Sequence, residues 1–552
     1  MLKTLLILAL FFSLKVSAQT NNQQQDKATD TTKSEVAEGE KKISKRDYSI
    51  NRSNSYSDLF FDSSALESFI VSNKVNDTIS RRMRSFYNTR NYQFAWFSSD
   101  GLTEQGRSFW NLHEYYTTAN TDPVLNDKDL KKKMNYLVSE EKLTVRSTDK
   151  ASVNTELNLT WHFIHYLVNN YKGGEIKRKE MERFVPYRKV DALYIADSVL
   201  TKKHKDNKYY ADVNEAYKAL LEQLQKYYDL AKKGGWQSIT TADKKITKGI
   251  TSPAVLALKK RLQLTGEMPA GDSTSVFNTQ LENAVKTFQV SRGLTATGVV
   301  TPGLINELNV PAVKRVQQLL INMERMRWML NNTEGRLAMV NIPEFVLHVY
   351  EGKNKAFDMN VVVGKEGHNT TIFTGNLNQV VFSPYWNVTP NIVRNEILPA
   401  MKKDPNYLSR NNMEQVGTAD GLPKIRQLPG EGNSLGKVKF LFPNSFDIYF
   451  HDTPSKNLFN SDKRAYSHGC IRLSDPEKMA TWVLQDQKEW TPDRIDDAMN
   501  SGQEQFVKVK DPVPVLITYY TAWVNDKGIL NFRDDIYKHD ATLLKKMFVN
   551  PL

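Results

Sequence analysis

Hydrophobic positions recur with two different periods along this chain. Between residues 58 and 330 apolar residues return every three or four positions, as they do on the buried face of a helix. From residue 336 onward they alternate with polar residues, as they do along a strand. Helices are predicted at residues 103–116, 157–171, 209–230 and 311–330. The two periods predict a multidomain α+β protein in which helical domains precede a mainly β domain.

The first helical region, residues 58–235, is interpreted as a scaffold domain because it contains no catalytic motif. His162 and His165 are spaced i, i+3 and could share a metal ion. No carboxylate or third ligand accompanies them, so histidines that pack in a core or line a groove are the favoured interpretation. The sequence predicts no metal site and no other cofactor.

Residues 236–310 carry two apolar stripes that predict a compact three-helix module. The stripes are Ala254, Val255, Leu258 and Leu262, and then Leu281, Ala284, Val285 and Phe288. Gly293 ends the second helix, and Thr301 caps a third helix that begins with Pro302. The series Phe288-Gln289, Gly293-Leu294, Gly298 and Thr301-Pro302 resembles the peptidoglycan-binding domain 1 family. This resemblance implies a module that binds peptidoglycan or serves as a spacer. Residues 311–335 are predicted to form a linking helix.

Short strands are predicted in the last domain, residues 336–522. They lie at residues 337–341, 345–350, 357–363, 378–383, 438–442 and 448–451. A polar, proline-containing stretch at residues 387–436 interrupts them and includes a predicted helix near residues 392–402. An insertion of this length is typical of a lid or binding loop, so we expect it to cap the site. Residues 523–552 are interpreted as a C-terminal tail.

Residues 1–18 have the pattern of a secretory signal peptide. Lys3 precedes an almost continuously apolar run, and Val16-Ser17-Ala18 offers a small-residue cleavage site. The run is about half of the ~20 residues that span a bilayer, and an uncleaved anchor is the alternative. The polar residues 19–57 predict a disordered linker. We therefore expect an exported protein of the periplasm or cell envelope.

Composition narrows the class of partner. The formal net charge of the 552 residues is +13, or about +11 once Lys3 and Lys15 leave with the signal. A basic exported protein suits an anionic polymer or a membrane surface. Nucleic acid is disfavoured because the compartment is wrong and no nucleic-acid-binding motif is found. No later segment is long and apolar enough to span a membrane, so no transmembrane partner is implied.

The single cysteine, Cys470, is the candidate nucleophile. Alone it cannot close an intramolecular disulfide or supply the sulfur ligands of a zinc site, and a small buried hydrophobe is the alternative interpretation. It lies in Ser467-His468-Gly469-Cys470-Ile471-Arg472, and His451 lies nineteen residues upstream. Two histidines and an arginine nearby favour a thiolate. Alternation places Tyr449 on the face of His451, and Cys470 is expected in a strand-to-helix turn.

At these residues the chain resembles the L,D-transpeptidase (YkuD/ErfK) family. The resemblance rests on the HDTP segment that begins at His451 and on the SHGCIRL segment that contains Cys470. Residues 385–388 and 427–440 resemble the longer YcbB-like subgroup, in which a helical scaffold and a peptidoglycan-binding module precede the catalytic domain. The resemblance covers most of residues 58–522.

The resemblance implies a peptidoglycan L,D-transpeptidase that works through a cysteine thioester. Cys470 would attack the carbonyl between residues three and four of a tetrapeptide donor stem and release D-Ala. The side-chain amine of a diamino-acid acceptor on a second stem would then complete a 3→3 cross-link. Carbapenems are the implied inhibitors.

The family also implies a role for each candidate residue. His451 is the base, oriented by the backbone carbonyl of Asp452, although His468 is closer to Cys470 in the sequence. Backbone N–H groups of Gly469 and Cys470 hold the oxyanion. The side chains expected to bind substrate are those of His468, Arg472, Tyr449 and Trp386. A structural ion pair for Arg472, and packing beneath the insertion for Trp386, are the alternatives.

Three other functions fit part of the pattern. Water in place of the amine would make the same site an L,D-carboxypeptidase. A non-catalytic protein could bind peptidoglycan through residues 236–310, but it would not need the intact motif around Cys470. A papain-like protease places its cysteine before its histidine, and the order here is reversed. The sequence leaves open the acceptor, the oligomeric state, cleavage of the signal and attachment of proteins to the wall.

Overall fold

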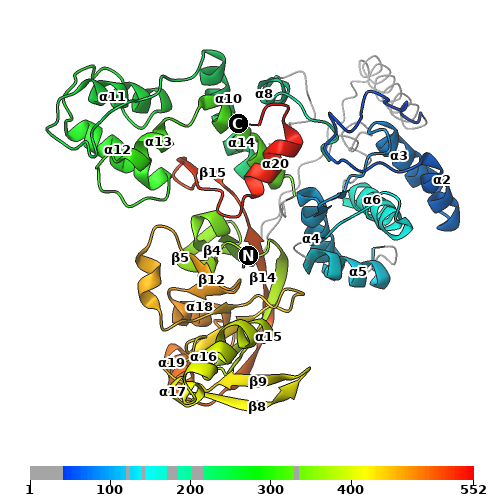
Figure 1. The fold of residues 1–552 in the computed structure, drawn as a ribbon, viewed down its shortest axis with the longest axis vertical. Coiled ribbons are helices and arrows are strands. Elements are labelled where there is room, and N and C mark those ends of the chain that lie inside the picture. The colour runs from blue at the N-terminus through cyan, green and yellow to red at the C-terminus, as the bar shows by residue number, and fades with distance from the viewer. Residues whose placement is uncertain are drawn as a thin grey trace, which may run out of the picture.

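The computed structural model describes residues 42–119, 125–139, 143–170, 185–201, 215–328 and 335–551. The predicted signal peptide and residues 19–41 of the predicted linker lie outside this part of the chain. Figure 1 shows a helical lobe, a smaller helical lobe and a β-rich lobe around central helices that include α10 (Glu215–Lys232), α14 (Ala312–Met326) and α20 (His539–Met547). The predicted α+β fold class is confirmed, with helical regions ahead of a β-rich domain.

The N-terminal lobe is helical and has an aromatic core. Its elements are α2 (Ser63–Ser72), α3 (Asp77–Asn88), β1 (Phe97–Ser98), β2 (Gly101–Leu102), α4 (Glu104–Ala119), α5 (Lys128–Ser139) and α6 (Lys150–Asn170). The hydroxyl of Thr103 caps α4 by accepting from the N–H of Gly106 at 3.1 Å. Trp96 is fully buried at the centre, and its indole N–H donates to the hydroxyl of Thr160 at 2.8 Å. Helices α4 and α6 therefore agree with two of the predicted segments.

Residues 42–57 are ordered, so the prediction of a disordered linker is wrong for this stretch. Ile50 and Tyr56 are buried, with 0% and 3% of their surface exposed. The N–H of Tyr56 donates to the carbonyl of Tyr187 at 3.2 Å, and Ser55 forms an isolated bridge with residue 188. Two apolar anchors hold an otherwise polar segment against the lobe, and average composition does not reveal them.

The central helices gather three distant parts of the chain. They are α8 (Ala192–Leu200), α10, α14 and α20, with β15 (Ala522–Val524) and β16 (Leu530–Phe532) packed beside them. In the predicted linking helix, α14, Val316, Leu319 and Ile321 are fully buried. The interpretation of residues 523–552 as a tail is wrong, because β15, β16 and α20 complete this core. Leu543 and Met547 give only a weak sequence signal, since they define an apolar face over a single short helix.

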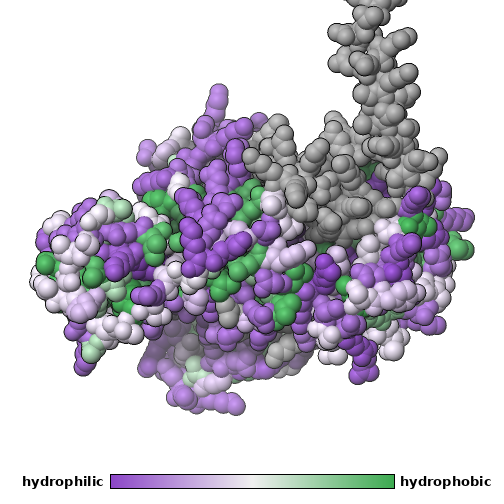
Figure 2. Space-filling model, turned by 90° about the horizontal axis from the view of Figure 1, so that it is seen from above, coloured by the Kyte–Doolittle hydropathy of each residue, from purple (hydrophilic) through white to green (hydrophobic). Residues whose placement is uncertain are grey.

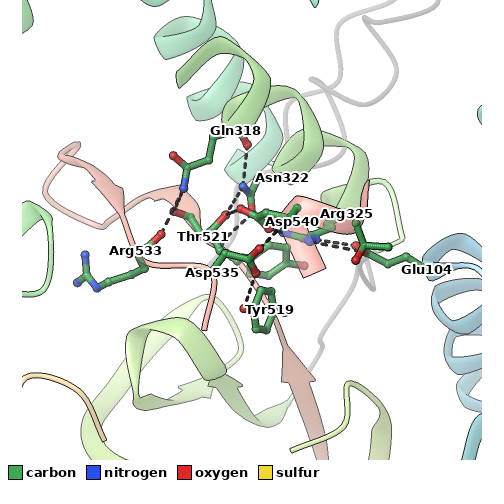
Figure 3. Close-up of polar contacts among 12 residues, drawn as sticks. Glu104, Gln318, Asn322, Arg325, Tyr519, Thr521, Arg533, Asp535 and Asp540 are labelled. Atoms are coloured by element: carbon green, nitrogen blue, oxygen red, sulfur yellow. Dashed lines mark hydrogen bonds and ion pairs between the residues drawn. The ribbon is translucent and has the colours of Figure 1, made fainter. Parts of the chain in front are cut away.

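A buried polar network joins α14 to the N-terminal lobe and to the C-terminal segment (Figure 3). Arg325 forms ion pairs with Glu104 of α4 and with Asp540 of α20, each at 2.6 Å. Asn322 donates to the hydroxyl of Thr521 at 2.8 Å, and that hydroxyl donates to Asp540 at 2.6 Å. One guanidinium thus links the scaffold to the segment that leaves the β-rich domain.

The smaller helical lobe contains the predicted three-helix module. Its helices are α11 (Pro253–Thr265), α12 (Thr279–Ser291) and α13 (Pro302–Leu308). Thr301 caps α13 and Pro302 occupies its first turn, as predicted. Arg533 of the C-terminal segment donates to the carbonyl of Ser291 at 3.0 Å and packs against Gly293. A Cβ at Gly293 would lie 2.5 Å from the Arg533 side chain, so this glycine serves docking as well as helix termination.

Nine strands form the sheet of the last domain. Their order is β12-β5-β13-β11-β10-β6-β14-β3-β4, and β4 also pairs with β5, which closes the sheet into a barrel. The strands are β3 (Arg336–Asn341), β4 (Val346–Glu351), β5 (Asn354–Gly364), β6 (Thr374–Phe382), β10 (Val438–Leu441), β11 (Phe450–His451), β12 (Ala465–Ser467), β13 (Ile471–Leu473) and β14 (Gln505–Thr518). Helices α18 (Pro476–Val483) and α19 (Pro492–Asn500) pack on its core through Met479, Trp482 and Ile495. The longest strand, β14, carries no clear sequence signal because a register shift between Lys508 and Val513 interrupts its alternation.

The predicted insertion folds as a small cap beside the barrel (Figure 1). Its elements are β7 (Trp386–Asn387), α15 (Pro390–Ile392), η2 (Val393–Ile397), α16 (Leu398–Lys403), α17 (Tyr407–Arg410), β8 (Met413–Ala419) and β9 (Leu422–Gln427). The cap has its own hydrophobic core, formed by Val388, Val393, Ile397 and Ile425. The segment η2 is a π-helical turn, a feature frequently found at functional sites.

Figure 2 shows the molecule from above, where hydrophilic residues cover most of the face and hydrophobic residues are interspersed among them. This pattern agrees with the scattered charge of the sequence. Within the described ranges, no helix is both long enough and apolar enough to cross a membrane.

Candidate active site

Parallel pairing of β11 with β13 brings the predicted site residues together. In this pairing His451 lies opposite Arg472. The N–H of Ile471 donates to the carbonyl of Tyr449 at 3.1 Å, which sets Tyr449 beside Cys470. Because side chains alternate along strands, one face of the sheet carries Tyr449, His451, Cys470 and Arg472. Ile471 points to the other side, into the core. Cys470 and His451 are therefore diagonal neighbours on the shared face.

The prediction that Cys470 occupies a strand-to-helix turn is wrong. Cys470 lies between β12 and β13, in a turn that joins two strands, and α18 begins only at Pro476. The helix cap is Asp475, whose side chain accepts from the N–H of Lys478. With only three residues, β13 is too short to show alternation before that cap, so the sequence suggests one continuous approach to the helix.

Hydroxyl groups hold the turn that carries Cys470. Gly469 has a φ of +118°, which residues with a side chain rarely adopt. Its carbonyl accepts from the Thr370 hydroxyl at 2.7 Å, and its N–H donates to the Ser467 hydroxyl at 3.1 Å. The Tyr537 hydroxyl accepts from the N–H of Thr370 at 3.3 Å. Since the Gly469 N–H is engaged within the turn, the oxyanion role expected for it requires this bond to be shared or broken.

The sulfur of Cys470 has two polar neighbours. Its thiol donates to the carbonyl of Asp447 at 3.5 Å, and Tyr449, the residue before β11, lies beside it. Burial raises the pKa of Cys470 to about 11, and the hydrogen bonds from Tyr449 and the charge of Arg472 offset only part of this rise. Arg472 thus lowers the thiol pKa, as expected of a nearby basic group, but burial has the larger effect and favours the neutral thiol in the resting site.

One side chain organises the loop that presents Asp447 to the thiol. The Asn444 amide makes four hydrogen bonds to backbone groups of residues 442–448. Asp447 has a φ of +53°, a left-handed conformation that aspartate tolerates better than most residues. The Asp447 carbonyl is thus held in place as the acceptor of the resting thiol. Its sequence signal is the turn composition Pro443-Asn444-Ser445, which indicates the loop but not its target.

His451 is buried and neutral. Its Nδ1 lies 2.5 Å from the backbone carbonyl oxygen of Asp452, the contact expected for that carbonyl. Burial, and next the positive charge of Arg472, lower the pKa of His451 to about 3, while backbone groups of Asp452 and Leu435 offset part of the shift. With the proton on Nδ1, the Nε2 atom carries the lone pair that can accept a proton from a thiol.

A groove of about 1200 Å³ runs between the barrel and the cap, and both Cys470 and His451 line it. On the cap side, Trp386 packs against the cap core, as the packing interpretation predicts, and it also lines the groove; its substrate-binding role stays a prediction. Nε2 of His468 lies 2.9 Å from a carboxylate oxygen of Glu396 in η2, which joins the motif to the cap. A groove of this size suits an extended peptide rather than a small metabolite.

Arg472 lines the groove with an unpaired donor. Its Nε is buried and has no hydrogen-bond partner, and burial lowers the pKa of its guanidinium. Within the described part of the chain, no ion pair is found for this residue, so the alternative of a structural ion pair is not supported. A partly buried guanidinium without a carboxylate is a suitable site for an anionic group of a ligand.

Comparison with known protein families finds matches in three successive parts of the chain. Residues 335–515 match the YkuD family, described as "L,D-transpeptidase catalytic domain". The chain contains an L,D-transpeptidase catalytic domain. Residues 81–224 match a family described as "Scaffold domain", and residues 251–308 match one described as "Putative peptidoglycan binding domain". The resemblance read from the motifs around Cys470 is therefore confirmed.

A curated relative resembles part of this chain. It is named "Putative L,D-transpeptidase", from Haemophilus influenzae; the alignment is 243 residues long with 30% identity, and it covers 41% of this chain. The match spans 49% of the relative, about half of its length. The solved L,D-transpeptidase of Xylanimonas cellulosilytica (residues 123–326) is 15% identical, with 50% of this chain and 99% of that chain covered and a TM-score of 0.16. LD transpeptidase LdtMt1 in complex with imipenem is 14% identical, with coverage of 34% and 59% and a TM-score of 0.19. At such TM-scores these two structures carry no argument about the site.

Several residues that shape the L,D-transpeptidase site have no motif of their own. They are Thr370, Glu396, Lys439, Asp447 and Tyr537. Each comes from a different segment, and Tyr537 lies in the region interpreted as a tail. Only the closed barrel and the cap bring them to Cys470, so no local pattern could have identified them.

The two histidines considered for a metal lie in the scaffold, away from the L,D-transpeptidase groove. Nδ1 of His162 is 2.9 Å from Nε2 of His113 inside the helical core. The ring of His165 packs edge-on at 5.9 Å from that of Trp161. Among the residues that the structure describes, no group of three or more histidine, cysteine or acidic side chains could hold a metal ion. The favoured interpretation of core histidines agrees with these contacts.

Proposed function

We propose that this protein is an L,D-transpeptidase that forms 3→3 peptidoglycan cross-links through a thioester on Cys470. The observation that carries the proposal is the pairing of β11 with β13, which makes Cys470 and His451 diagonal neighbours on the wall of a peptide-sized groove. The match of residues 335–515 to the L,D-transpeptidase catalytic domain supports the reaction class.

Acylation begins from a neutral pair. The thiol proton of Cys470 passes to Nε2 of His451 while the sulfur attacks the carbonyl between residues three and four of a tetrapeptide stem. The resulting oxyanion lies at the turn, where the N–H of Cys470 and, once released from Ser467, that of Gly469 can donate to it. The C–N bond then breaks, His451 returns the proton to the leaving nitrogen, and D-Ala departs from a thioester.

The second half-reaction consumes the thioester. The side-chain amine of a diamino acid on a second stem attacks the thioester carbonyl and gives its proton to His451. The C–S bond breaks, and the proton on His451 passes to the departing sulfur, which restores the resting thiol. The product carries a new amide between two third residues.

Substrate contacts follow from the groove. Arg472 has the unpaired buried donor that a stem carboxylate would satisfy, and Trp386 offers an apolar wall. Tyr449 lies beside Cys470 and lowers the pKa of its thiol, so its hydroxyl can stabilise negative charge that develops on the sulfur. His468 contributes to binding at the cap through its pair with Glu396.

The wider setting belongs to the same proposal. We place the protein in the periplasm or cell envelope, on the signal-like pattern of residues 1–18, and assign the α11–α13 module to peptidoglycan binding on its family match. We propose that carbapenems acylate Cys470 here, because their strained lactam carbonyl resembles the carbonyl of the acyl donor. Intact-mass analysis should then detect one adduct on the wild type and none on Cys470→Ala.

Analysis of muropeptides tests the reaction. Purified sacculi are incubated with the enzyme, digested and examined by mass spectrometry for dimers and free D-Ala. Dimers with 3→3 bonds indicate the transpeptidase, whereas D-Ala with tripeptides and no dimers indicates the carboxypeptidase. Binding without either product indicates a non-catalytic protein. Cys470→Ser should fold and form neither product, and dimers made by this variant would refute the assignment of the nucleophile.

A further inference from the structure

Lys439, His451 and Arg472 form one row across three neighbouring strands. Antiparallel pairing of β10 with β11 sets Lys439 opposite His451, and parallel pairing of β11 with β13 sets His451 opposite Arg472. All three side chains line the groove. Residues that face each other on neighbouring strands stand ~5 Å apart, so they contact the same part of a ligand. The buried base therefore has a cation on each side.

The charge of Lys439 is only partly balanced by the protein. Its Nζ lies 3.7 Å from a carboxylate oxygen of Glu504, which is beyond hydrogen-bond distance. The same oxygen accepts from the backbone N–H of Tyr385 at 3.0 Å. Only 13% of the Lys439 side chain is exposed, and burial lowers its pKa while Glu504 opposes this shift. An ammonium has three donors, so Lys439 can bind an anion in the groove and keep its weak contact with Glu504.

The order of the row assigns the two cations to different parts of the donor stem, and this step rests on the proposed function. The nucleophile Cys470 immediately precedes β13, the strand of Arg472, so the acyl half of the scissile bond lies on that side. His451 must reach the leaving nitrogen, and Lys439 lies one strand further in the same direction. In a tetrapeptide the leaving residue is the last one, and its carboxylate is attached to the carbon that bears the leaving nitrogen.

We propose that Lys439 binds the terminal carboxylate of the leaving residue and thereby selects stems that end at that residue. A carboxylate one carbon from the nitrogen at His451 lies next to the neighbouring position of the row. An additional residue would move the carboxylate about 3.5 Å further along the chain and leave a neutral amide against a buried ammonium. Arg472 is left to contact the half of the donor that stays on the enzyme.

Two synthetic tetrapeptide donors test this assignment, one with a terminal carboxylate and one with a carboxamide. Release of D-Ala or of its amide is measured by mass spectrometry, and kcat/KM is compared between donors. A charge-assisted hydrogen bond corresponds to about a ten- to hundredfold difference in kcat/KM. The wild type should prefer the acid donor by such a factor. Lys439→Met should lose most of this preference because its kcat/KM falls on the acid and changes little on the amide.

Matched variants separate recognition from a structural role. Lys439→Arg keeps the charge and should keep the preference, and Lys439→Gln should behave as Lys439→Met if the latter folds poorly. Lys508→Met removes an exposed lysine of β14 and should leave the ratio unchanged. If Lys439→Met and Lys439→Gln lose kcat/KM equally on both donors, or keep the wild-type ratio between the donors, the assignment of Lys439 is overturned. The proposed function is not affected by that result. If the wild type releases nothing from either donor, the proposed function fails and this inference fails with it.

Discussion

The imidazole of His451 is oriented by a backbone atom of the next residue, since its Nδ1 lies 2.5 Å from the carbonyl oxygen of Asp452. A carbonyl oxygen only accepts, so Nδ1 carries the ring proton. The Asp452 carboxylate accepts from the N–H of Lys437 at 2.9 Å and pairs with Lys456 at 2.7 Å. These contacts fix the position of the Asp452 residue and so of its backbone carbonyl. A Cβ at Gly436 would lie 2.3 Å from that carboxylate, so only glycine permits the arrangement.

The first prediction concerns how the reactivity of the Cys470 thiol depends on pH. Because the pKa of Cys470 is raised to about 11 and that of His451 is lowered to about 3, the resting pair is neutral and the thiolate grows only above pH 9. Alkylation by iodoacetamide, followed by intact mass, should therefore be slow at pH 7 and rise steadily toward pH 11. The chain has one cysteine, so Cys470→Ala is a complete control. A rate that already reaches a plateau near pH 7 would instead indicate a thiolate–imidazolium pair.

A second prediction concerns the support of the turn. The Tyr537 hydroxyl donates to the carbonyl of Gly364 at 2.6 Å and accepts from the N–H of Thr370, whose hydroxyl holds Gly469. Tyr537→Phe leaves two buried groups unpaired, so we expect a loss of about 1–3 kcal/mol in unfolding free energy. Acylation by a tetrapeptide donor should also slow several-fold, because Cys470 loses its fixed position. Thermal unfolding and single-turnover kinetics measure the two effects.

The control for Tyr537→Phe is Tyr519→Phe. Tyr519 stacks on Tyr537 at 5.8 Å, donates its hydroxyl to Asp535 at 2.8 Å and accepts from the backbone N–H of Tyr537 at 2.9 Å, so it supports the Tyr537 backbone while the Tyr537 hydroxyl keeps its own bonds to Gly364 and Thr370. It should lower stability by a similar amount and leave acylation nearly unchanged. Equal slowing by both variants would show that general loosening of the barrel, rather than support of the turn, limits the rate.

The third prediction is a pH dependence of stability from His348. Its ring lies 2.7 Å from Asp358 and 3.0 Å from Glu344, and these carboxylates raise the pKa of His348 to about 9 against the opposing effect of burial. A raised histidine pKa stabilises the fold fully below pH 6.5, and the contribution disappears as pH rises through 9. His348→Gln should therefore cost roughly 3 kcal/mol at pH 6 and little at pH 10. Thermal unfolding at both values measures this difference.

Lys355→Met provides the matched control for His348. Lys355 also pairs with Asp358, at 2.9 Å, and its carboxylate partners raise its pKa. Lysine stays charged across the whole interval from pH 6 to pH 10, so its replacement should have the same effect at each pH. A pH-independent cost of His348→Gln would mean that the ring is neutral in the folded protein.

The sequence predicts much of the site because its chemistry is concentrated in two short segments. Cys470 is unique, His451 ends a strand, and alternation places Tyr449 beside it, so the main participants could be named from local patterns. The direction of the thiol pKa shift could not be predicted. It depends on how much water the cap and the loop at Asp447 exclude, and neighbouring basic residues say nothing about burial.

Prediction of the fold from the sequence also failed where segments distant in the sequence pack together. Helices with long apolar stripes, such as α12 and α14, could be predicted from the sequence, and so could Thr301 as the N-cap residue of α13. The ordered segment at Ile50 and the docking of α20 could not, because each depends on a few apolar residues that meet partners far away in the sequence. Lys439 in its strand likewise looks like any solvent-facing lysine until the register sets it opposite His451.

The last prediction tests the junction at Arg325, where one guanidinium separates two carboxylates (Figure 3). Burial raises the pKa of Asp540 to about 6 even though Arg325 opposes the shift. In Arg325→Met this opposition is lost, so the pKa of Asp540 rises further and the native state binds more protons than the unfolded chain above pH 4. Stability must then fall as pH rises, and we expect a cost of about 3–5 kcal/mol at pH 8 and a smaller one at pH 5. Calorimetry of the full chain measures both.

The triple variant Glu104→Gln, Arg325→Met, Asp540→Asn removes every charge of the junction and should recover most of the loss at pH 8, with little dependence on pH. An equal cost of Arg325→Met at both pH values would mean that packing of the arginine stem, rather than its charge, holds the scaffold in place.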